Sequence, residues 1–312
     1  MKYRKLGRTG LNVSEISLGS WLTYGGYVEK EKAANSIHKA YELGINFFDT
    51  ANVYERGAAE TVVGEALRNY PRESYVLATK VFGEMGDGPN DRGLSRKHII
   101  EQCNASLNRL GLDYIDVYYC HRFDRGTPLE ETLRALDDLV TQGKVLYVGV
   151  SEWTAYQMVE AHAIADKLLL DRIVVNQPVY NMFNRYIEKE VIPMGTEKGI
   201  SQVVFSPLAQ GILTGKYRKG QEIPSESRAN SKNWGADHIK EEHLEKVEKL
   251  IHIADELGIR LSQLALAWIL RQENVASALI GASRPEQVEE NCRASEIHLS
   301  DEVMKSIDEV LS

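Results

Sequence analysis

Short apolar segments alternate with longer amphipathic ones along nearly the whole chain, and this alternation limits the fold more than any other feature. Eight segments have the length and apolar content of buried strands: 16–20, 46–50, 75–80, 114–120, 144–150, 173–177, 202–205 and 278–281. The spacing of apolar residues predicts helices over 32–43, 58–69, 96–110, 128–141, 155–168, 187–198, 262–271 and 285–294. Eight strands that are each followed by a helix indicate an α/β fold, one parallel (β/α)8 TIM barrel, with a doubly wound sheet as the competing arrangement.

Local signals mark the ends of some of these elements. Gly44 follows the first predicted helix as a C-terminal glycine, and Ser95 is placed to cap the helix that starts at residue 96. Thr127 followed by Pro128 is typical of a helix start, with the threonine as the cap and the proline as the first helical residue. These signals support the helix boundaries drawn from periodicity.

Segments outside the eightfold pattern complete the expected architecture. Turn residues at 7–10 predict a small hairpin before the first barrel strand, in a position to close the bottom of the barrel. Two extra helices are predicted over 243–257 and 301–311, and the polar connection 215–242 has the length of a functional loop. We expect a single barrel domain over residues 1–312.

The composition excludes several classes of protein. Of 312 residues, 43% are hydrophobic and 26% are charged, which is ordinary for a globular chain and excludes a disordered one. The formal net charge of −8 argues against a nucleic acid or an anionic membrane as the main partner. Three cysteines make no disulfide framework, the histidines show no spacing that predicts a metal site, and no apolar run reaches the ~18 residues of a membrane span. We expect a cytoplasmic protein without a signal peptide or direct membrane insertion.

Polar residues lie at the predicted carboxyl ends of the strands, where β/α barrels carry their chemistry. The residues at these ends are Ser20-Trp21, Asp49-Thr50, Lys80, His121, Ser151, Gln177, Ser206-Pro207 and Gly281. A barrel that only has to be stable does not need an aspartate, a lysine and a histidine at three consecutive strand ends. The pattern therefore predicts a reactive site at this mouth of the barrel.

Asp49, Tyr54, Lys80 and His121 form the candidate catalytic group. A free tyrosine titrates near ~10, and a lysine beside it favours the phenolate and lowers that pKa. At about 4 Å and an effective dielectric constant of ~20, one such charge pair is worth about 4 kcal/mol, so we expect Tyr54 to approach the working range of a general acid. Asp49 would hold Lys80 in place and charged, and His121 would orient a substrate carbonyl. Taken singly, each residue has a structural alternative: a turn aspartate, a packed tyrosine, a solvated lysine and a core histidine.

Five motifs, in order along the chain, resemble those of the aldo-keto reductases. Residues 46–64 contain Asp-Thr-Ala followed by a tyrosine and later by glutamate and glycine. The other four are Ala78-Thr79-Lys80, the run 107–120 that leads into His121, Gly149-Val150-Ser151, and IGASRPEQVEEN at 280–291. The resemblance covers residues 3–311 and implies NADPH as the cofactor. No Gly-x-Gly-x-x-Gly fingerprint occurs in the sequence, as the resemblance predicts.

Within that superfamily the chain is most similar to the β subunits of voltage-gated potassium channels and their bacterial relatives. The shared segments are WLTYGG at 21–26, RGLSRKHIIE at 92–101, SPLAQGILTGKY at 206–217 and GASRPEQVEEN at 281–291. The animal channel subunits carry asparagine at the position of His121, and the histidine here favours catalysis over a purely sensing role. The same resemblance raises a homo-oligomer, a tetramer or a dimer, and a channel partner.

The resemblance also implies which residues hold the nicotinamide half of the cofactor. Ser20, Trp21 and Asp49 would line the nicotinamide end, and Ser151 and Gln177 would bind the carboxamide. Glu152 stands where many relatives have asparagine and the channel subunits arginine, which puts the carboxamide contact there in question.

The remainder of the cofactor is assigned in the same way. The pyrophosphate would lie along Ser206, Pro207, Leu208, Ala209 and Gln210. Two cations of the long loop, Lys216 and Arg228, would close over it. The adenosine end would lie at the last strand end and the helix after it, at Gly281, Ser283, Gln287, Glu290 and Asn291, with Arg284 nearby. Residues 283–287 open a helix, whose N-terminal amides favour a phosphate.

These observations predict NADPH-dependent reduction of aldehydes, and also of ketones, with Tyr54 as the general acid. The alternative is a regulatory subunit that binds NADP and reports its redox state to a membrane channel, with slow or vestigial reductase activity. A cofactor-free barrel lyase or isomerase is a third alternative. The partner expected for the enzyme is a small-molecule carbonyl substrate, with no nucleic acid and no metal.

Overall fold

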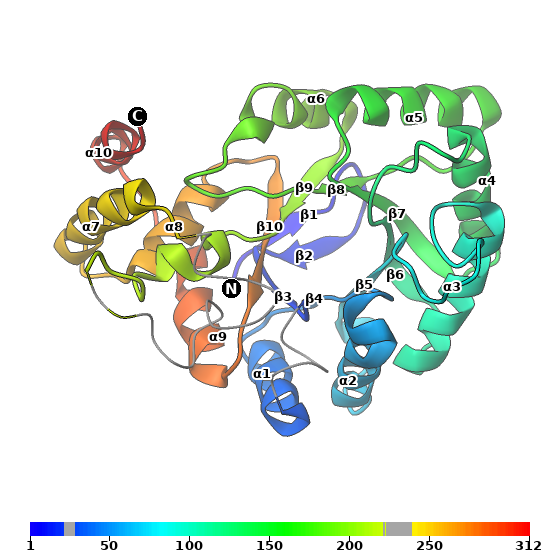
Figure 1. The fold of residues 1–312 in the computed structure, drawn as a ribbon, viewed down its shortest axis with the longest axis horizontal. Helices are drawn as coiled ribbons and strands as arrows, with labels where there is room; N and C mark the ends of the chain where they lie inside the picture. Colours follow the sequence, from blue (N-terminus) through cyan, green and yellow to red (C-terminus); the bar gives the residue numbers. More distant parts are fainter. Residues whose placement is uncertain (22–28, 221, 223–238) are drawn as a thin grey trace.

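The computed structural model describes residues 1–21, 29–220, 222 and 239–312. Arg228 and most of the WLTYGG segment lie outside the described residues. Eight parallel strands close into a barrel in chain order (Figure 1), with the last strand paired to the first. They are β3 (Ile16–Gly19), β4 (Phe47–Asp49), β5 (Val76–Val81), β6 (Ile115–Cys120), β7 (Val145–Ser151), β8 (Val175–Gln177), β9 (Ser201–Val204) and β10 (Val275–Gly281). The predicted TIM barrel is confirmed, and the doubly wound alternative is wrong.

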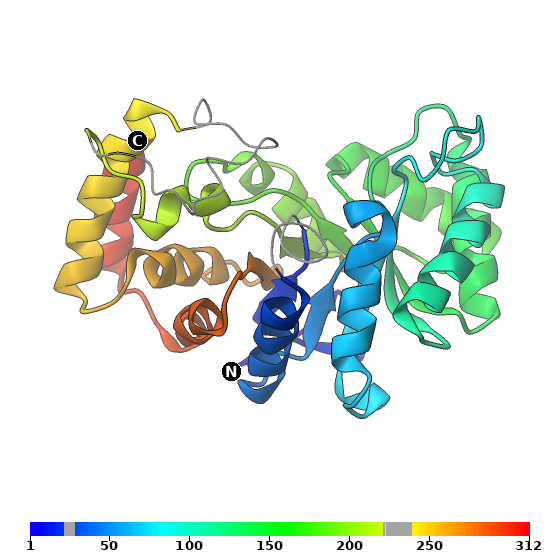
Figure 2. The ribbon, with the colours of Figure 1, turned by 60° about the horizontal axis from the view of Figure 1, so that its bottom comes forward.

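One helix follows each barrel strand, and these helices surround the barrel (Figures 1 and 2). They are α1 (Lys30–Glu42), α2 (Ala58–Leu67), α3 (Arg96–Leu110), α4 (Leu129–Thr141), α5 (Ala155–Leu168), α6 (Val191–Lys198), α8 (Leu261–Leu270) and α9 (Pro285–Cys292). The largest departures from the predicted bounds are at α6 and β10. A separate 3-10 turn, Tyr186–Glu188, precedes α6, which therefore begins later than predicted. Strand β10 begins at Val275, earlier than predicted, and only four residues separate it from α8.

The predicted N-terminal hairpin is present as β1 (Tyr3–Lys5) and β2 (Asn12–Ser14), paired antiparallel. Leu6 and Val13 are fully buried in one apolar cluster with Phe47, Val76 and Val175, each of which is the first residue of its barrel strand. The Arg4 guanidinium also donates to the carbonyl oxygens of residues 270, 272 and 275. The hairpin therefore closes the amino-terminal end of the barrel and leaves the carboxyl end for chemistry.

Two further helices, α7 (Glu241–Glu256) and α10 (Asp301–Leu311), lie outside the eightfold pattern, as predicted. They pack against each other at one edge of the molecule (Figure 1), and Lys246 Nζ donates to the Leu311 carbonyl at 2.8 Å. Among the described residues, no helix combines the length and apolarity that a membrane crossing requires.

The predicted signals at the helix ends are correct at Ser95 and Gly44 and wrong at Thr127. Ser95 Oγ accepts from His98 N at the start of α3, and Gly44 has a φ of +85° just past α1, as expected. Thr127 does not cap α4, because its hydroxyl donates to Asp124 Oδ2 at 2.9 Å, and Pro128 takes the cap position without a side-chain bond. A carboxylate within hydrogen-bond reach has displaced the local helix signal.

Candidate active site

Lys80 lies one residue before the end of β5, and its side chain is fully buried. Its ammonium group donates to three oxygens. These are Asp49 Oδ1, the Thr50 carbonyl at 2.8 Å and the Tyr54 hydroxyl at 3.3 Å. Because adjacent parallel strands end at the same edge, β4 and β5 bring residues 31 apart into one ion pair.

Tyr54 and His121 complete the group that the sequence predicted. The Tyr54 and His121 rings meet edge to face with centroids 5.7 Å apart, and Lys80 Nζ lies 4.9 Å from the Tyr54 centroid. Asp49 and Lys80 are at most 1% exposed, whereas Tyr54 and His121 are only half-buried. The structure therefore brings together all four predicted residues, with the ion pair below and the two rings toward the opening.

The expected lowering of the Tyr54 pKa is wrong. Burial raises the pKa of Tyr54 above its usual value of 10.0; the Lys80 ammonium opposes this, and the Asp49 carboxylate adds to it. A lysine alone would lower the pKa of Tyr54, but the ion pair places a carboxylate beside that lysine and the fold removes water from the phenol. Tyr54 is thus held as the protonated phenol, which is the form that donates a proton.

The two other ionisable neighbours have defined charge states. Burial alone would lower the pKa of Lys80, but the Asp49 carboxylate and the Tyr54 hydroxyl raise it, so the ammonium is kept. Burial, Lys80 and Arg122 lower the pKa of His121 well below 6.5. At neutral pH, His121 is a neutral imidazole that carries one N–H donor.

A second layer of hydrogen bonds engages residues that were expected to bind the cofactor. Gln177 Nε2 donates to Asp49 Oδ2 at 2.8 Å, and Ser151 Oγ donates to the Gln177 carbonyl at 2.8 Å. Ser20 Oγ donates to Thr50 Oγ1 at 2.9 Å. Asp49 is therefore held from both sides, a feature that sequence reasoning missed because Gln177 lies 128 residues away.

The backbone at the mouth is strained. Seven non-glycine residues of the described chain have a positive φ, and six lie in loops after β4, β7 and β9: Glu55, Arg56, Glu152, Ser206, Ala209 and Gln210. Each such residue costs about 1–3 kcal/mol, and strain of this kind clusters at ligand-binding sites. Three of the six belong to the segment Ser206–Gln210, where Pro207 is buried and the Asn181 amide donates to the Ser206 carbonyl at 3.0 Å.

The residues predicted for the adenosine end lie together around α9. Gln287 Oε1 accepts from Ser283 N at 2.9 Å, and Glu290 Oε1 accepts from Ser262 Oγ at 2.9 Å. Asn291, on the same helix, is 5% exposed. Gly281, at the end of β10, is exposed, and so are Arg284 and Lys216.

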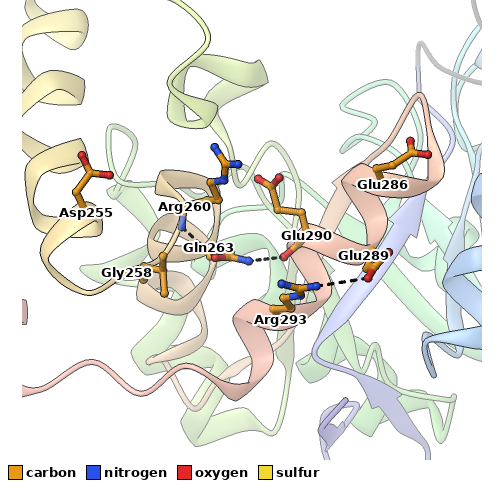
Figure 3. Close-up of a pocket in the computed structure, with 9 residues that line it drawn as sticks. Asp255, Gly258, Arg260, Gln263, Glu286, Glu289, Glu290 and Arg293 are labelled. Atoms are coloured by element: carbon orange, nitrogen blue, oxygen red, sulfur yellow. Dashed lines mark hydrogen bonds and ion pairs between the residues drawn. The ribbon is translucent and has the colours of Figure 1, made fainter.

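Glu290 also lines a cavity of about 590 Å³ between α9, the start of α8 and the turn after α7 (Figure 3). Its lining residues are Asp255, Gly258, Ile259, Arg260, Gln263, Glu286, Glu289, Glu290 and Arg293. Gln263 Nε2 donates to the Glu290 carbonyl at 2.8 Å, and Arg293 pairs with Glu289. The carboxylates that dominate this lining do not suit an anion, and no part of the predicted catalytic group lines it.

One network near the mouth was given no role in the sequence analysis. Glu60 on α2 is fully buried; its oxygens accept from Thr79 Oγ1 and Arg109 Nε, each at 2.5 Å. Arg109 also packs against the 3-10 turn Tyr54–Gly57, which we call the Tyr54 turn. A Cβ atom added at Gly57 (φ +95°) would lie 2.5 Å from Arg109 Cδ. The glutamate belongs to the first aldo-keto reductase motif, and that was the signal available to find it.

No group of three or more histidine, cysteine or acidic side chains suited to a metal occurs among the described residues. The assembled site is therefore a buried Lys-Asp pair under a phenol and a neutral imidazole. Such a site can hold a carbonyl oxygen between two hydrogen-bond donors and deliver a proton to it.

Comparison with known proteins agrees with this geometry. The model of the Aldo/keto reductase family matches residues 15–312. An Arabidopsis thaliana protein named "Probable voltage-gated potassium channel subunit beta" is 46% identical over 303 residues, covering 95% of this chain and 92% of its own length. An Oryza sativa subsp. japonica protein of the same name is 44% identical over 319 residues, covering 100% of this chain and 97% of its own. The chain therefore belongs to the aldo/keto reductase family, whose members are oxidoreductases that generally use NAD(P)H.

Proposed function

We propose that this protein reduces aldehydes, and also ketones, to alcohols with NADPH, as one domain that spans residues 1–312. The observation that carries the proposal is the Tyr54 hydroxyl 3.3 Å from the ammonium of Lys80, which is itself paired with Asp49. A phenol beside a buried cation can give up its proton to a nearby alkoxide, because the cation stabilises the phenolate that remains.

The residues at the mouth fit a dinucleotide. The strained backbone at Ser206, Ala209 and Gln210 is a feature that a bound ligand would explain. We propose that these residues, with Ser20, Trp21, Ser151, Gln177, Lys216, Arg228 and the α9 residues assigned above, hold the cofactor. A nicotinamide bound there supplies a hydride to the carbonyl carbon of the substrate.

Each catalytic residue then has one task. His121, kept neutral by its surroundings, donates its N–H to the carbonyl oxygen and orients it. Tyr54 gives its proton to the same oxygen as negative charge develops there, and Lys80 stabilises the resulting phenolate. Asp49, which accepts a hydrogen bond from Gln177, keeps Lys80 charged and holds its side chain in position. Because both rings are only half-buried, a substrate carbonyl oxygen that enters from the mouth can reach Tyr54 and His121.

The first experiment is a stopped-flow absorbance trace at the NADPH band with purified protein, NADPH and a small panel of aldehydes. We expect repeated turnover that falls by about 10²–10⁴ in Tyr54→Phe, because the general acid is lost. A fluorescence titration with NADPH is the control, and it should give the same affinity for both proteins. Turnover of Tyr54→Phe near the wild-type rate would contradict the assignment.

A second function is favoured by the names of the relatives, which are those of channel β subunits. In that case the protein would be a regulatory subunit, in a homo-oligomer, that binds NADP(H) and transmits its redox state to a membrane channel. The same trace separates the two functions. One slow oxidation per cofactor, followed by tight retention of the product, would favour the sensor, whereas sustained turnover favours the enzyme.

A further inference from the structure

Arg122 lies at the rim of the mouth, directly after His121, and its side chain is exposed. Its Nη1 group donates to the His121 carbonyl at 2.6 Å and reaches Ser151 Oγ at 3.4 Å. Both neighbours belong to the site: His121 is the proposed carbonyl donor, and Ser151 closes β7. The guanidinium is therefore held over the same opening through which a carbonyl substrate has to enter.

The acidic side chains nearest to Arg122 in the chain and on the next strand end are engaged elsewhere. Glu152, after β7, accepts from Val179 N at 2.5 Å and from the Tyr186 hydroxyl at 3.4 Å. Asp124 accepts from backbone N–H groups of two loops and from the Thr127 hydroxyl. Across the described part of the chain, Arg122 forms no ion pair, although the protein carries a net charge of −8.

The charge of Arg122 reaches the reacting groups. It contributes to lowering the pKa of His121, and it opposes the burial that raises the pKa of Tyr54. A cation that acts on both proposed donors lies a short distance from the carbonyl that they hold. A guanidinium also presents several N–H donors in a planar fork, which matches the two oxygens of a carboxylate.

We infer that Arg122 binds an anionic group of the carbonyl substrate, and that the preferred substrates are short oxo acids, with a carboxylate a few carbon atoms from the aldehyde. This inference rests on the proposed function and specifies its substrate class. The reaction is unchanged, since the carboxylate is bound and not transformed. The contact between Arg122 and His121 limits the distance between the two groups of the substrate. The anionic group must lie close to the substrate carbonyl, on the side of the mouth where Ser151 lies.

The test compares succinic semialdehyde with its methyl ester, which differ in charge and share the same aldehyde two methylene groups from the carboxyl carbon. We expect the wild-type protein to favour the acid in kcat/KM, and Arg122→Gln to lower the acid-to-ester ratio by about ten- to a hundredfold, as expected for loss of a hydrogen-bonded charge pair. Arg122→Lys should fall between them, because it keeps the charge and loses the fork. Arg125→Gln is the matched control: it removes an exposed arginine of the same loop and should leave the ratio unchanged.

An unchanged acid-to-ester ratio in Arg122→Gln would overturn the inference. So would an equal loss for both substrates with a raised KM for NADPH, since Arg122 would then act on the cofactor. If the wild-type protein turns over neither substrate, the proposed function fails, and a calorimetric titration with benzoate in the presence of NADP⁺ decides the inference separately. Benzoate that binds wild type about tenfold or more tightly than Arg122→Gln supports an anion site, and equal binding overturns it.

Discussion

Neighbouring residues of strand β5 point to opposite faces of the barrel wall, and each joins a buried carboxylate. Lys80 faces the interior and pairs with Asp49, whereas Thr79 faces the helices and donates to Glu60, which also pairs with Arg109. Both carboxylates are at most 1% exposed. The two networks are thus alike in charge and burial, and a single peptide bond separates them.

They differ in where they end. The outer network is enclosed between α2 and α3, and its last member, Arg109, packs against the Gly57 backbone and Ser106. The inner network continues from Lys80 to the hydroxyl of a half-buried tyrosine beside a half-buried histidine. A buried ion pair becomes chemically useful when it is connected to a titratable group that a substrate can reach. The outer pair lacks that connection, so we assign it the role of fixing the strand and the Tyr54 turn.

The largest expected effect is on the inner network. Lys80→Met should lower kcat by about 10³, because the phenolate left after proton transfer loses its neighbouring cation. Pre-steady-state NADPH oxidation measures this directly. Cofactor titration and urea unfolding are the controls, since the variant also leaves Asp49 buried without its ion-pair partner. A variant that binds NADPH and turns over within about tenfold of wild type would contradict the role of Lys80.

The next effect is on stability and belongs to the outer network. Glu60→Gln should reduce the free energy of unfolding by about 3 kcal/mol, because Arg109 is left without its carboxylate in a largely buried position. Urea unfolding measures the loss, and Thr79→Val is the matched variant, which removes one hydrogen bond and should cost only about 1 kcal/mol. If Glu60→Gln unfolds at the wild-type urea concentration, the outer network does not hold the strand.

The smallest expected effect concerns pH. Tyr54 must be protonated to act, and burial raises its pKa above 10.0, while the lowered pKa of His121 keeps the imidazole neutral above pH 6.5. The rate of the reduction step should therefore be level from pH 7 to pH 9 and fall only at higher pH. Single-turnover traces across this range check the expectation. A tenfold fall between pH 7 and pH 9 would mean that Lys80 outweighs burial after all.

Sequence periodicity was sufficient for the architecture. The eight strands, the helices that follow them, the hairpin and the two extra helices could all be predicted, because a buried parallel strand is apolar along its length and a surface helix is apolar on one face. Motif order and strand-end position also predicted four residues that the structure brings into contact at the mouth of the barrel. Local signals were adequate where one hydrogen bond decides the outcome, as at Ser95, and failed at Thr127, where Asp124 competes for the same hydroxyl.

What the sequence by itself determined is which residues stand at the carboxyl ends of the strands, since element type and order follow from short-range pattern. Only the tertiary structure decided what surrounds them. The Gln177 contact to Asp49, the Glu60–Arg109 pair and the direction of the Tyr54 pKa depend on which distant segments exclude water from a side chain. Desolvation is a property of packing in three dimensions, and in Tyr54 it outweighs the charge of Lys80.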